Sequence, residues 1–582
     1  MAEYNVLLKL GVITATLSQF HLPRNQFSLI TELDSIFIQE TDHREVTMSS
    51  HEEQRAKQRL EEYINQRTNL IAEERAERFD AQVIASATEK EKRAAEIVSA
   101  LRAKEAKEIW SASPEKLMYP GMEFLIARET ILNTKLFAVV KKLPKGAILH
   151  GHMDAMCDAK FLYQNALKYP QMHVRVNSLI TSDSSLPLPQ FKPLTADLCT
   201  QFLNAPGLTS ENYTPDSWVP LQKARNEFEY GPEEFDKWIV GTMMINPKEA
   251  YVDYNTSVKI WEKFGSTFRV AGGMIRYEPI MKEYMRQVLL SSIEDGISYV
   301  ELRINFFYKL AIREDGSETL EHRDYLTMLG EVIKEVKHQL KAEGREDEFV
   351  GAKVIYTTLR FVTNEELIWY LEDCMALKKE FPDLIAGFDL VAQEDTNNPL
   401  IYYIESLLWF QQETKNRGLD IPFIFHAGET LDDGGAADSN LYDALLLGTK
   451  RIGHGFSLAK HPVLMKMCKE RGVAIEVCPI SNEILRLTSS MPMHPLPVLL
   501  NNGVSVALCP DDPSVFGNMG LSFDFFQVIV ASEITSILSL KQLARQSLEY
   551  SSLDAKDKEK AIELWEKRWN AYIEDIITSV AP

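Results

Sequence analysis

The stretch Pro144-Lys-Gly-Ala-Ile-Leu-His-Gly-His-Met-Asp154 joins a short apolar strand, expected at 147–149, to two histidines one residue apart. In an extended chain, residues i and i+2 point to the same side. His150 and His152 can therefore direct their imidazoles at one point, as the nitrogen ligands of a cation such as zinc must. The pattern alone is weak, because an H-x-H sequence occurs by chance in many soluble proteins. A metal site needs further ligands from other parts of the chain.

Seven more apolar segments follow the first one, separated by stretches with helical periodicity. They are residues 299–305, 353–358, 384–391, 422–426, 451–454, 473–478 and 504–509. Near-continuous apolar strands suit a parallel sheet that is covered on its outer face. Helices such as 364–381 and 400–417 can form the connections. Eight strand–helix units predict an α/β fold, a (β/α)8 TIM-type barrel rather than an open sheet.

Two other regions surround this barrel. Residues 1–115 are expected to form an N-terminal helical region, because 51–110 are charged, rich in alanine and nearly free of glycine and proline. This pattern suits a solvated helix as well as a dimerisation arm, and does not decide between them. Residues 170–235 carry eight prolines, which predicts an irregular insertion after the first strand. The barrel and its C-terminal helices then take residues 116–169 and 236–582, with 121–142 as one amphipathic helix before the first strand.

Composition narrows the class of partner. The 582 residues carry a formal net charge of -21, which argues against binding to nucleic acid or to an anionic membrane, since both need a basic surface. A neutral small molecule fits better. No segment is apolar enough for a transmembrane helix, and the N-terminus lacks the basic start of a secretory signal, so a cytoplasmic location is expected. None of the six cysteines forms a C-x-x-C pair, and pairing of Cys157 with Cys199 stays open.

Chemically active residues follow five of the predicted strands. These are His150 and His152 after strand 1, His426-Ala-Gly-Glu429 after strand 5, Gly453-His-Gly455 after strand 6, Cys478-Pro-Ile-Ser-Asn482 after strand 7 and Asp511-Asp512-Pro513 after strand 8. Each has an ordinary structural explanation, such as a capping aspartate or a hydrogen-bonded histidine. In a (β/α)8 barrel, however, the C-terminal strand ends meet on one rim, where active sites lie. Their joint placement therefore favours a shared site.

The residue types on this rim suit a metal-dependent hydrolysis. His150, His152 and His426 offer nitrogen and Asp511 offers oxygen, which leaves room on zinc for a water molecule. Zinc lowers the pKa of such a water towards neutrality.

The same rim carries candidates for acid–base chemistry. His454 can accept a proton near pH 7. Glu429 stands three residues after a ligand and can protonate the substrate. Of the adjacent acids Asp511 and Asp512, the first can bind metal while the second binds substrate.

In this order, H-x-H, H-A-G-E, G-H-G, C-P-x-S-N and D-D-P resemble the adenosine deaminase family of metal-dependent hydrolases. Further segments resemble its adenosine-deaminase-related growth factor branch: Pro144-Lys-Gly-Ala, Trp261-Glu-Lys-Phe264, Gly387-Phe-Asp-Leu-Val and Ile475-Glu-Val-Cys-Pro-Ile-Ser-Asn482. The layout is also similar, with an N-terminal helical dimerisation region and an insertion after strand 1. The resemblance covers about residues 115–575.

The resemblance implies hydrolytic deamination of adenosine and 2′-deoxyadenosine by a homodimer with one Zn²⁺ per subunit. The implied metal ligands are His150, His152, His426 and Asp511. The implied catalytic residues are Glu429, which protonates purine N1, His454, which positions or deprotonates the water that attacks C6, and the ligand Asp511. The implied substrate contacts are Asp512 with purine N7, Asp154 with the ribose 5′-hydroxyl, Trp261 over the ribose, and the Ala392 N–H with purine N3.

Three departures from the family pattern fall on the substrate side. Ala392 replaces the usual glycine, Leu359 replaces a ribose-side histidine, and Met153 separates the second zinc histidine from Asp154. Another 6-aminopurine (adenine, a nucleotide or an N6-substituted form) therefore remains an alternative substrate. A signalling or binding protein with a vestigial deaminase core is a further alternative. The growth-factor branch is typically secreted, which makes secretion the alternative location.

Overall fold

The computed structural model describes residues 50–111, 117–181 and 186–580. It divides the chain into two compact units, Met1–Glu77 and Arg78–Pro582. In the first unit the described element is helix α4 (Ser50–Ala76), whose exposed face carries pairs such as Gln58 and Glu62 at the i,i+4 spacing. Residues 1–49 of the expected N-terminal region lie outside the described residues.

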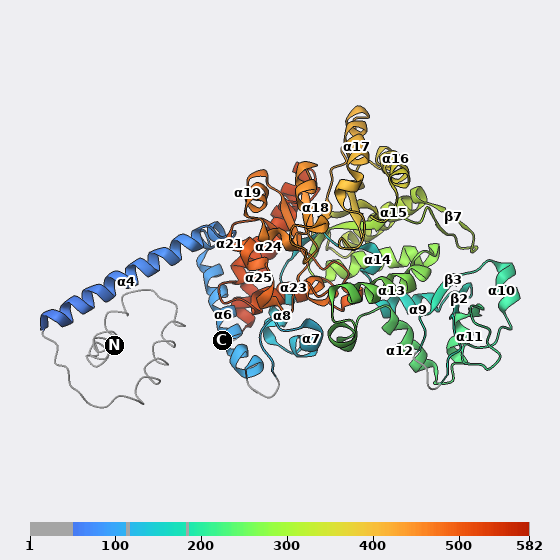
Figure 1. Ribbon diagram of the computed structural model, residues 1–582. Coiled ribbons are helices and arrows are strands. Elements are labelled where there is room, and N and C mark those ends of the chain that lie inside the picture. The colour runs from blue at the N-terminus through green and yellow to red at the C-terminus, as the bar shows by residue number, and fades with distance from the viewer. Residues whose placement is uncertain (1–49, 112–116, 182–185, 581–582) are drawn as a thin grey trace. The chain divides into compact units, whose positions relative to one another are not determined.

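Eight parallel strands form the centre of the second unit, behind helices that Figure 1 labels. They are β1 (Gly146–Ile148), β5 (Ile297–Asn305), β8 (Gly351–Leu359), β9 (Ile385–Val391), β10 (Phe425–Ala427), β11 (Arg451–His454), β12 (Ala474–Val477) and β13 (Val506–Leu508). They pair in the orders β1-β5-β8-β9 and β10-β11-β12-β13. Nearly all strand residues are buried, as the continuous apolar runs predicted. The predicted α/β class and all eight strand positions are confirmed.

Parallel bridges at both junctions join the two four-stranded groups into a ring. Phe388 pairs with Phe423 between β9 and β10, and Gly151 pairs with Asp511 just beyond the ends of β1 and β13. At the second junction the N–H of His152 donates to the carbonyl of Asp511 over 3.1 Å. The ring is the predicted (β/α)8 barrel, and the bridge that closes it brings the first histidine segment against the last acidic one.

Helices cover the outside of the ring, one after each strand. They include α14 (Glu278–Glu294), α15 (His322–Ala342), α16 (Asn364–Glu380), α17 (Ile404–Asn416), α18 (Ala436–Leu446) and α19 (Pro462–Arg471). The start of α16 is set by Thr363, whose side chain accepts a hydrogen bond from the N–H of Glu366. The predicted helices 364–381 and 400–417 are α16 and α17, the latter preceded by a 3₁₀ turn at Leu400–Tyr403.

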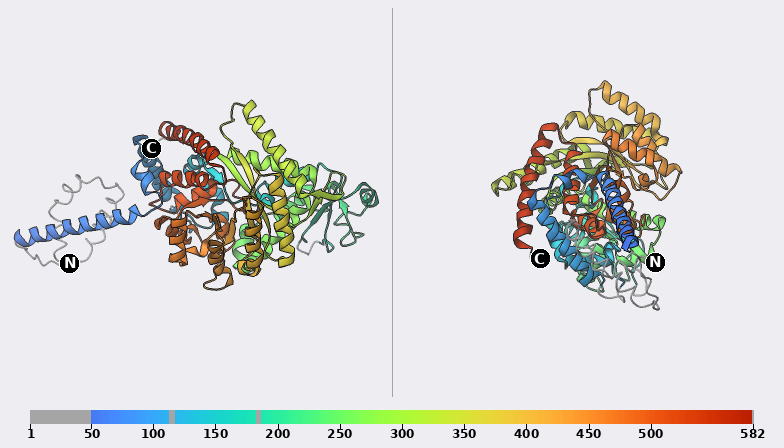
Figure 2. Two further views of the ribbon diagram at one scale, coloured as in Figure 1. Left: turned by 90° about the horizontal axis from the view of Figure 1, so that it is seen from above. Right: turned by 90° about the vertical axis from the view of Figure 1, so that its left-hand side faces the viewer.

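The ends of the second unit pack on each other. Helix α6 (Glu89–Glu105) lies beside the C-terminal helix α25 (Ala555–Ser579), as Figure 2 shows, and the indole of Trp569 donates to Glu91 over 2.8 Å. Trp565 and Trp569 stack at 5.8 Å between ring centroids. The predicted single helix at 121–142 is wrong. The segment forms α7 (Phe124–Leu132) and α8 (Lys135–Lys141), because Thr134 caps a new helix by accepting from the N–H of Phe137.

The segment after β1 builds a small sheet of its own. Strands β2 (Met172–Arg175), β3 (Gln190–Pro193) and β4 (Val219–Pro220) pair antiparallel, with α10 (Ala196–Phe202), α11 (Leu221–Asn226) and α12 (Pro232–Thr242) around them. The thiols of Cys157 and Cys199 are free. Among the described residues, no helix is long and apolar enough to cross a membrane.

Candidate active site

Three histidines from opposite sides of the barrel meet at its C-terminal rim. His150 and His152 follow β1, and His426 lies in β10. The ring centroid of His150 is 5.3 Å from that of His152 and 4.5 Å from that of His426. One ligand nitrogen from each ring lies within 4.8 Å of the other two. The fold therefore brings together the three histidines that the sequence singled out.

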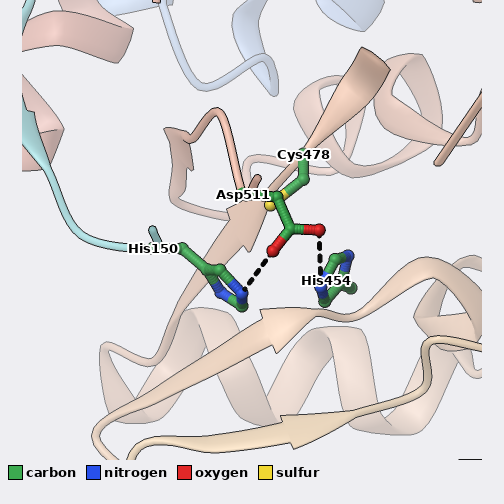
Figure 3. Close-up of side chains that lie close together, drawn as sticks. All are labelled: His150, His454, Cys478 and Asp511. Atoms are coloured by element: carbon green, nitrogen blue, oxygen red, sulfur yellow. Dashed lines mark ion pairs between the residues drawn. The ribbon is translucent and has the colours of Figure 1, made fainter. Parts of the chain in front are cut away.

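Asp511 completes this group (Figure 3). Its Oδ1 lies 3.3 Å from Nε2 of both His150 and His152, and its Oδ2 lies 3.7 Å from Nε2 of His454. The hydroxyl of Ser481 donates to Oδ2 over 2.7 Å. Asp511 and His454 both have left-handed backbones, with φ of 59° and 61°. Such conformations cost free energy in residues other than glycine and are often found at active sites.

A thiol lies beside the same group. The sulfur of Cys478 is within 4.8 Å of ligand atoms of His150, His454 and Asp511 (Figure 3). Burial raises the pKa of this thiol well above its usual range, so it carries its proton.

Two buried carboxylates orient the histidines. Oε2 of Glu476 lies 2.9 Å from Nδ1 of His150, and Oδ2 of Asp389 lies 2.6 Å from Nδ1 of His426. An ionised carboxylate only accepts hydrogen bonds, so each Nδ1 carries the hydrogen and each Nε2 keeps a free lone pair. Glu476 and Asp389 were not predicted as site residues. In the sequence, each is an acidic residue inside an apolar strand segment, Ile475-Glu-Val477 and Phe388-Asp-Leu390. This contrast is the signal that could have identified them.

This arrangement fits a bound cation. Nε2 of His150 and Oδ1 of Asp511 are buried, face each other at 3.3 Å and have no hydrogen-bond partner within the part of the chain that the structure describes. Both present lone pairs, so they repel each other unless a positive charge lies between them. Three nitrogens and one carboxylate oxygen are a donor set for a divalent transition metal. We conclude that the site holds a metal cofactor.

Two buried arginines hold Glu476 in its charged form. Nη2 of Arg303 donates to Glu476 over 2.8 Å, and Nε of Arg451 donates to it over 2.6 Å. Burial alone would raise the pKa of Glu476, but the two guanidinium groups hold it well below its usual range. The carboxylate therefore stays an acceptor for His150.

Glu429 is a buried carboxyl group, with Oε1 3.5 Å from Nδ1 of His454. It lies after β10 and is 4% exposed. Burial raises the pKa of Glu429 well above its usual range, and the negative charges of Asp511 and Glu394 add to this. The backbone is fixed by Glu394, which accepts from the N–H of Glu429 over 2.8 Å and from that of Gly428 over 3.2 Å. Burial and these neighbouring charges thus favour the protonated form of Glu429.

A hydrogen-bond chain sets the proton of His454. The backbone N–H of Leu496 donates to Nδ1 of His494 over 2.9 Å, so Nε2 of His494 carries the hydrogen and donates to Oδ1 of Asn482 over 3.0 Å. The amide Nδ2 of Asn482 then donates to Nδ1 of His454 over 3.1 Å. Burial lowers the pKa of His454 to about 3. His454 is therefore a neutral imidazole with its hydrogen on Nε2, facing Asp511. His494 lies outside every predicted motif.

Three of the predicted substrate contacts, Asp154, Ala392 and Asp512, lie shortly after the barrel strands β1, β9 and β13. Asp512 is buried, and burial with the neighbouring charge of Asp511 raises its pKa well above the usual range. Asp154 lies in a 3₁₀ turn (Met153–Ala155), where burial raises its pKa to about 6. Ala392 follows β9 with a φ of 95°.

Trp261 reaches the site region only indirectly. It lies in α13 (Ser257–Ile275), and its ring meets that of Phe264 at 5.0 Å. Phe264 in turn stacks at 5.6 Å on Phe516, shortly after Asp512. Among the described residues, no ring-to-ring contact joins Trp261 to the histidines.

Comparisons with known proteins agree with this geometry. The family model for adenosine deaminase matches residues 240–567. Adenosine deaminase 2-A of Danio rerio is 35% identical over 460 residues, which cover 78% of this chain and 84% of the relative. Adenosine deaminase 2 of Homo sapiens is 30% identical over 514 residues, covering 88% and 93%. A solved structure of the ADAL–IMP complex aligns with a TM-score of 0.50 at 15% identity, covering 75% of this chain and 99% of that one, and bears on the fold alone.

Proposed function

The chain belongs to the adenosine deaminase family, and on this premise we propose that it hydrolyses adenosine and 2′-deoxyadenosine to inosine and 2′-deoxyinosine plus ammonia. The observation that carries the proposal is the buried Glu429, whose raised pKa favours the protonated form, near a group of three histidines and Asp511 that can bind a metal. Hydrolysis of an aromatic amine needs both an activated water and an acid that protonates the ring.

The proposed metal is one Zn²⁺ per subunit. Its ligands would be His150, His152, His426 and Asp511, whose atoms meet as described above. Zinc held by these residues would lower the pKa of a water and so would supply a nucleophile near neutral pH.

The protein's own groups handle the purine ring. Glu429 would give its proton to N1, which makes C6 more electrophilic. His454, with its hydrogen on Nε2, would donate a hydrogen bond that positions the attacking water; this favours the positioning role over the base role. Purine N7 is an acceptor, so Asp512 must carry a proton to bind it, and its raised pKa supplies that proton.

The sugar-side roles remain proposals from the family resemblance. Asp154 would bind the 5′-hydroxyl, Trp261 would close over the ribose, and the N–H of Ala392 would meet N3. The unusual residues Ala392 and Leu359 lie on this side, which motivates a substrate panel.

The direct test measures inosine formed from adenosine by the zinc-loaded protein, followed by ultraviolet absorbance. The panel includes 2′-deoxyadenosine, adenine, AMP and N6-methyladenosine, compared by kcat/KM. We expect the two nucleosides to be preferred, and an absence of inosine with full zinc occupancy would contradict the proposal. A biological activity that persists in Glu429→Ala would instead support a binding protein with a vestigial core.

Further expectations concern assembly, organisation and location. We propose that α4 and the rest of residues 1–115 form a dimerisation arm, that 170–235 form a separate insertion, and that the enzyme is a homodimer. Analytical ultracentrifugation of the full chain tests the dimer. The cytoplasmic or secreted location is decided by fractionation of producing cells and medium.

A further inference from the structure

One arginine binds both carboxylates that orient His150 and His426. Arg303 lies in β5 and is 1% exposed. Its Nε donates to Oδ2 of Asp389 over 2.9 Å, and its Nη2 donates to Oε2 of Glu476 over 2.8 Å. These are the same two oxygens that face Nδ1 of His426 and Nδ1 of His150. A single guanidinium therefore holds both orienting carboxylates.

The same arginine also fixes the backbone that carries the third histidine. Its N–H donates to the carbonyl of Gly151 over 3.0 Å, and its Nη1 donates to the carbonyl of Leu149 over 2.9 Å. His152 and Arg303 form an isolated parallel bridge. Arg303 thus connects to all three histidines, either through its side chain or through its backbone.

The planar fork of arginine is suited to this position. Its several N–H groups point in fixed directions, whereas a lysine ammonium is a single point charge on a flexible stem. Two carboxylates buried this close together repel each other unless a cation compensates both. Among the described residues, Arg451 contacts only Glu476 of these two carboxylates. It donates to Glu476 over 2.6 Å and also forms an ion pair with Glu301.

We propose that Arg303 is a positioning residue that preorganises the metal site by fixing His150 and His426 through Glu476 and Asp389. The proposal rests on the metal ligand set of the proposed function. It assigns Arg303 no contact with the substrate.

The test compares Arg303→Lys with the matched control Arg451→Lys in the full chain. Zinc affinity is measured without nucleoside by competition with a chromophoric chelator. We expect the Kd for zinc to rise by about 10- to 100-fold in Arg303→Lys, as for other residues that orient metal ligands, and to rise less in Arg451→Lys. The visible spectrum of the Co²⁺-loaded protein should also change, because it reports ligand geometry.

A double-mutant cycle with Asp389→Asn separates positioning from general stability. If Arg303 acts through Asp389, the two substitutions change the logarithm of the zinc Kd by less than the sum of their single effects. The melting temperature of each variant in excess chelator reports folding independently. Wild-type zinc affinity and an unchanged Co²⁺ spectrum in Arg303→Lys, or strictly additive effects, would overturn the proposal. A wild-type protein that binds zinc but leaves adenosine unchanged would contradict the proposed function alone.

Discussion

The imidazole of His494 donates from Nε2 to Oδ1 of Asn482 over 3.0 Å, and this hydrogen bond determines how Asn482 faces the active site. Because the oxygen of Asn482 is engaged, its NH₂ group is turned towards Nδ1 of His454, 3.1 Å away. This series of hydrogen bonds starts at the backbone N–H of Leu496, which can only donate and therefore fixes Nδ1 of His494 as an acceptor. His494, which lies outside the predicted motifs, thereby selects which nitrogen of His454 carries the hydrogen.

Replacement of His494 by phenylalanine removes the hydrogen bond to Asn482, so the amide of Asn482 should no longer be held in one orientation. Part of the molecules would then carry the hydrogen of His454 on Nδ1, and kcat should fall by about tenfold or more with KM little changed. Steady-state kinetics and ¹⁵N spectra of labelled histidines measure both effects. His461→Phe, which alters a histidine paired with Asp438 outside the site, is the control. Unchanged kinetics and ¹⁵N signals in His494→Phe would refute the relay.

Glu429→Gln tests the proton donor. Glutamine has nearly the same shape but cannot protonate N1, so kcat should fall by about 10²- to 10⁴-fold. Because burial favours the uncharged form of Glu429, the uncharged glutamine should leave the melting temperature and the zinc content unchanged. Full activity in a zinc-loaded Glu429→Gln enzyme would assign the proton to another group.

Ala392→Gly addresses the backbone after β9. A φ of 95° is unfavourable for alanine and allowed for glycine, so the substitution should raise the free energy of unfolding by about 1 kcal/mol. Ala386→Gly, within β9 itself, is the control. Its φ is not positive, so glycine there should be destabilising. Denaturant unfolding measures both, and equal destabilisation of the two variants would show that residue 392 carries no strain.

Glu483 should make the stability depend on pH. Its Oε2 accepts from the N–H of Phe124 over 3.0 Å, and burial raises the pKa of Glu483 from 4.5 to about 8. The folded protein therefore keeps a proton that the unfolded chain loses above about pH 4.5. The stabilisation that comes from tighter proton binding in the folded state is fully present below that pH. It falls by about 1.4 kcal/mol per pH unit as the pH rises towards the folded-state pKa of Glu483.

The comparison with Glu483→Gln isolates this group. The difference in unfolding free energy between variant and wild type should shift in favour of the variant from about pH 5 to about pH 8. Denaturant unfolding over this range measures it. A difference that stays constant with pH would mean that Glu483 ionises normally in the folded protein.

Much of this molecule can be predicted from local patterns. Continuous apolar segments separated by helices predict eight parallel strands, and H-x-H, H-A-G-E and D-D-P stand where those strands end. Since the strand ends of a barrel meet on one rim, the convergence of His150, His426 and Asp511 followed from their order along the chain. Local patterns gave a wrong helix boundary where a single side chain sets it. The hydroxyl of Thr134 caps a second helix inside a segment whose periodicity predicts one continuous helix.

Residue types and strand periodicity were enough to predict the barrel, the metal-donor atoms and the carboxyl group of Glu429, because these depend on local sequence. The folded structure was needed to find which charges inside the barrel compensate one another and which nitrogen of each histidine carries a hydrogen. Arg303, Asp389 and Glu476 come from three different strands and meet only when the ring has closed. The tautomer of His454 depends on a loop residue, His494, that folding brings beside Asn482. Hydrogen-bond direction is a property of pairs in space, so it appears only once the partners are in place.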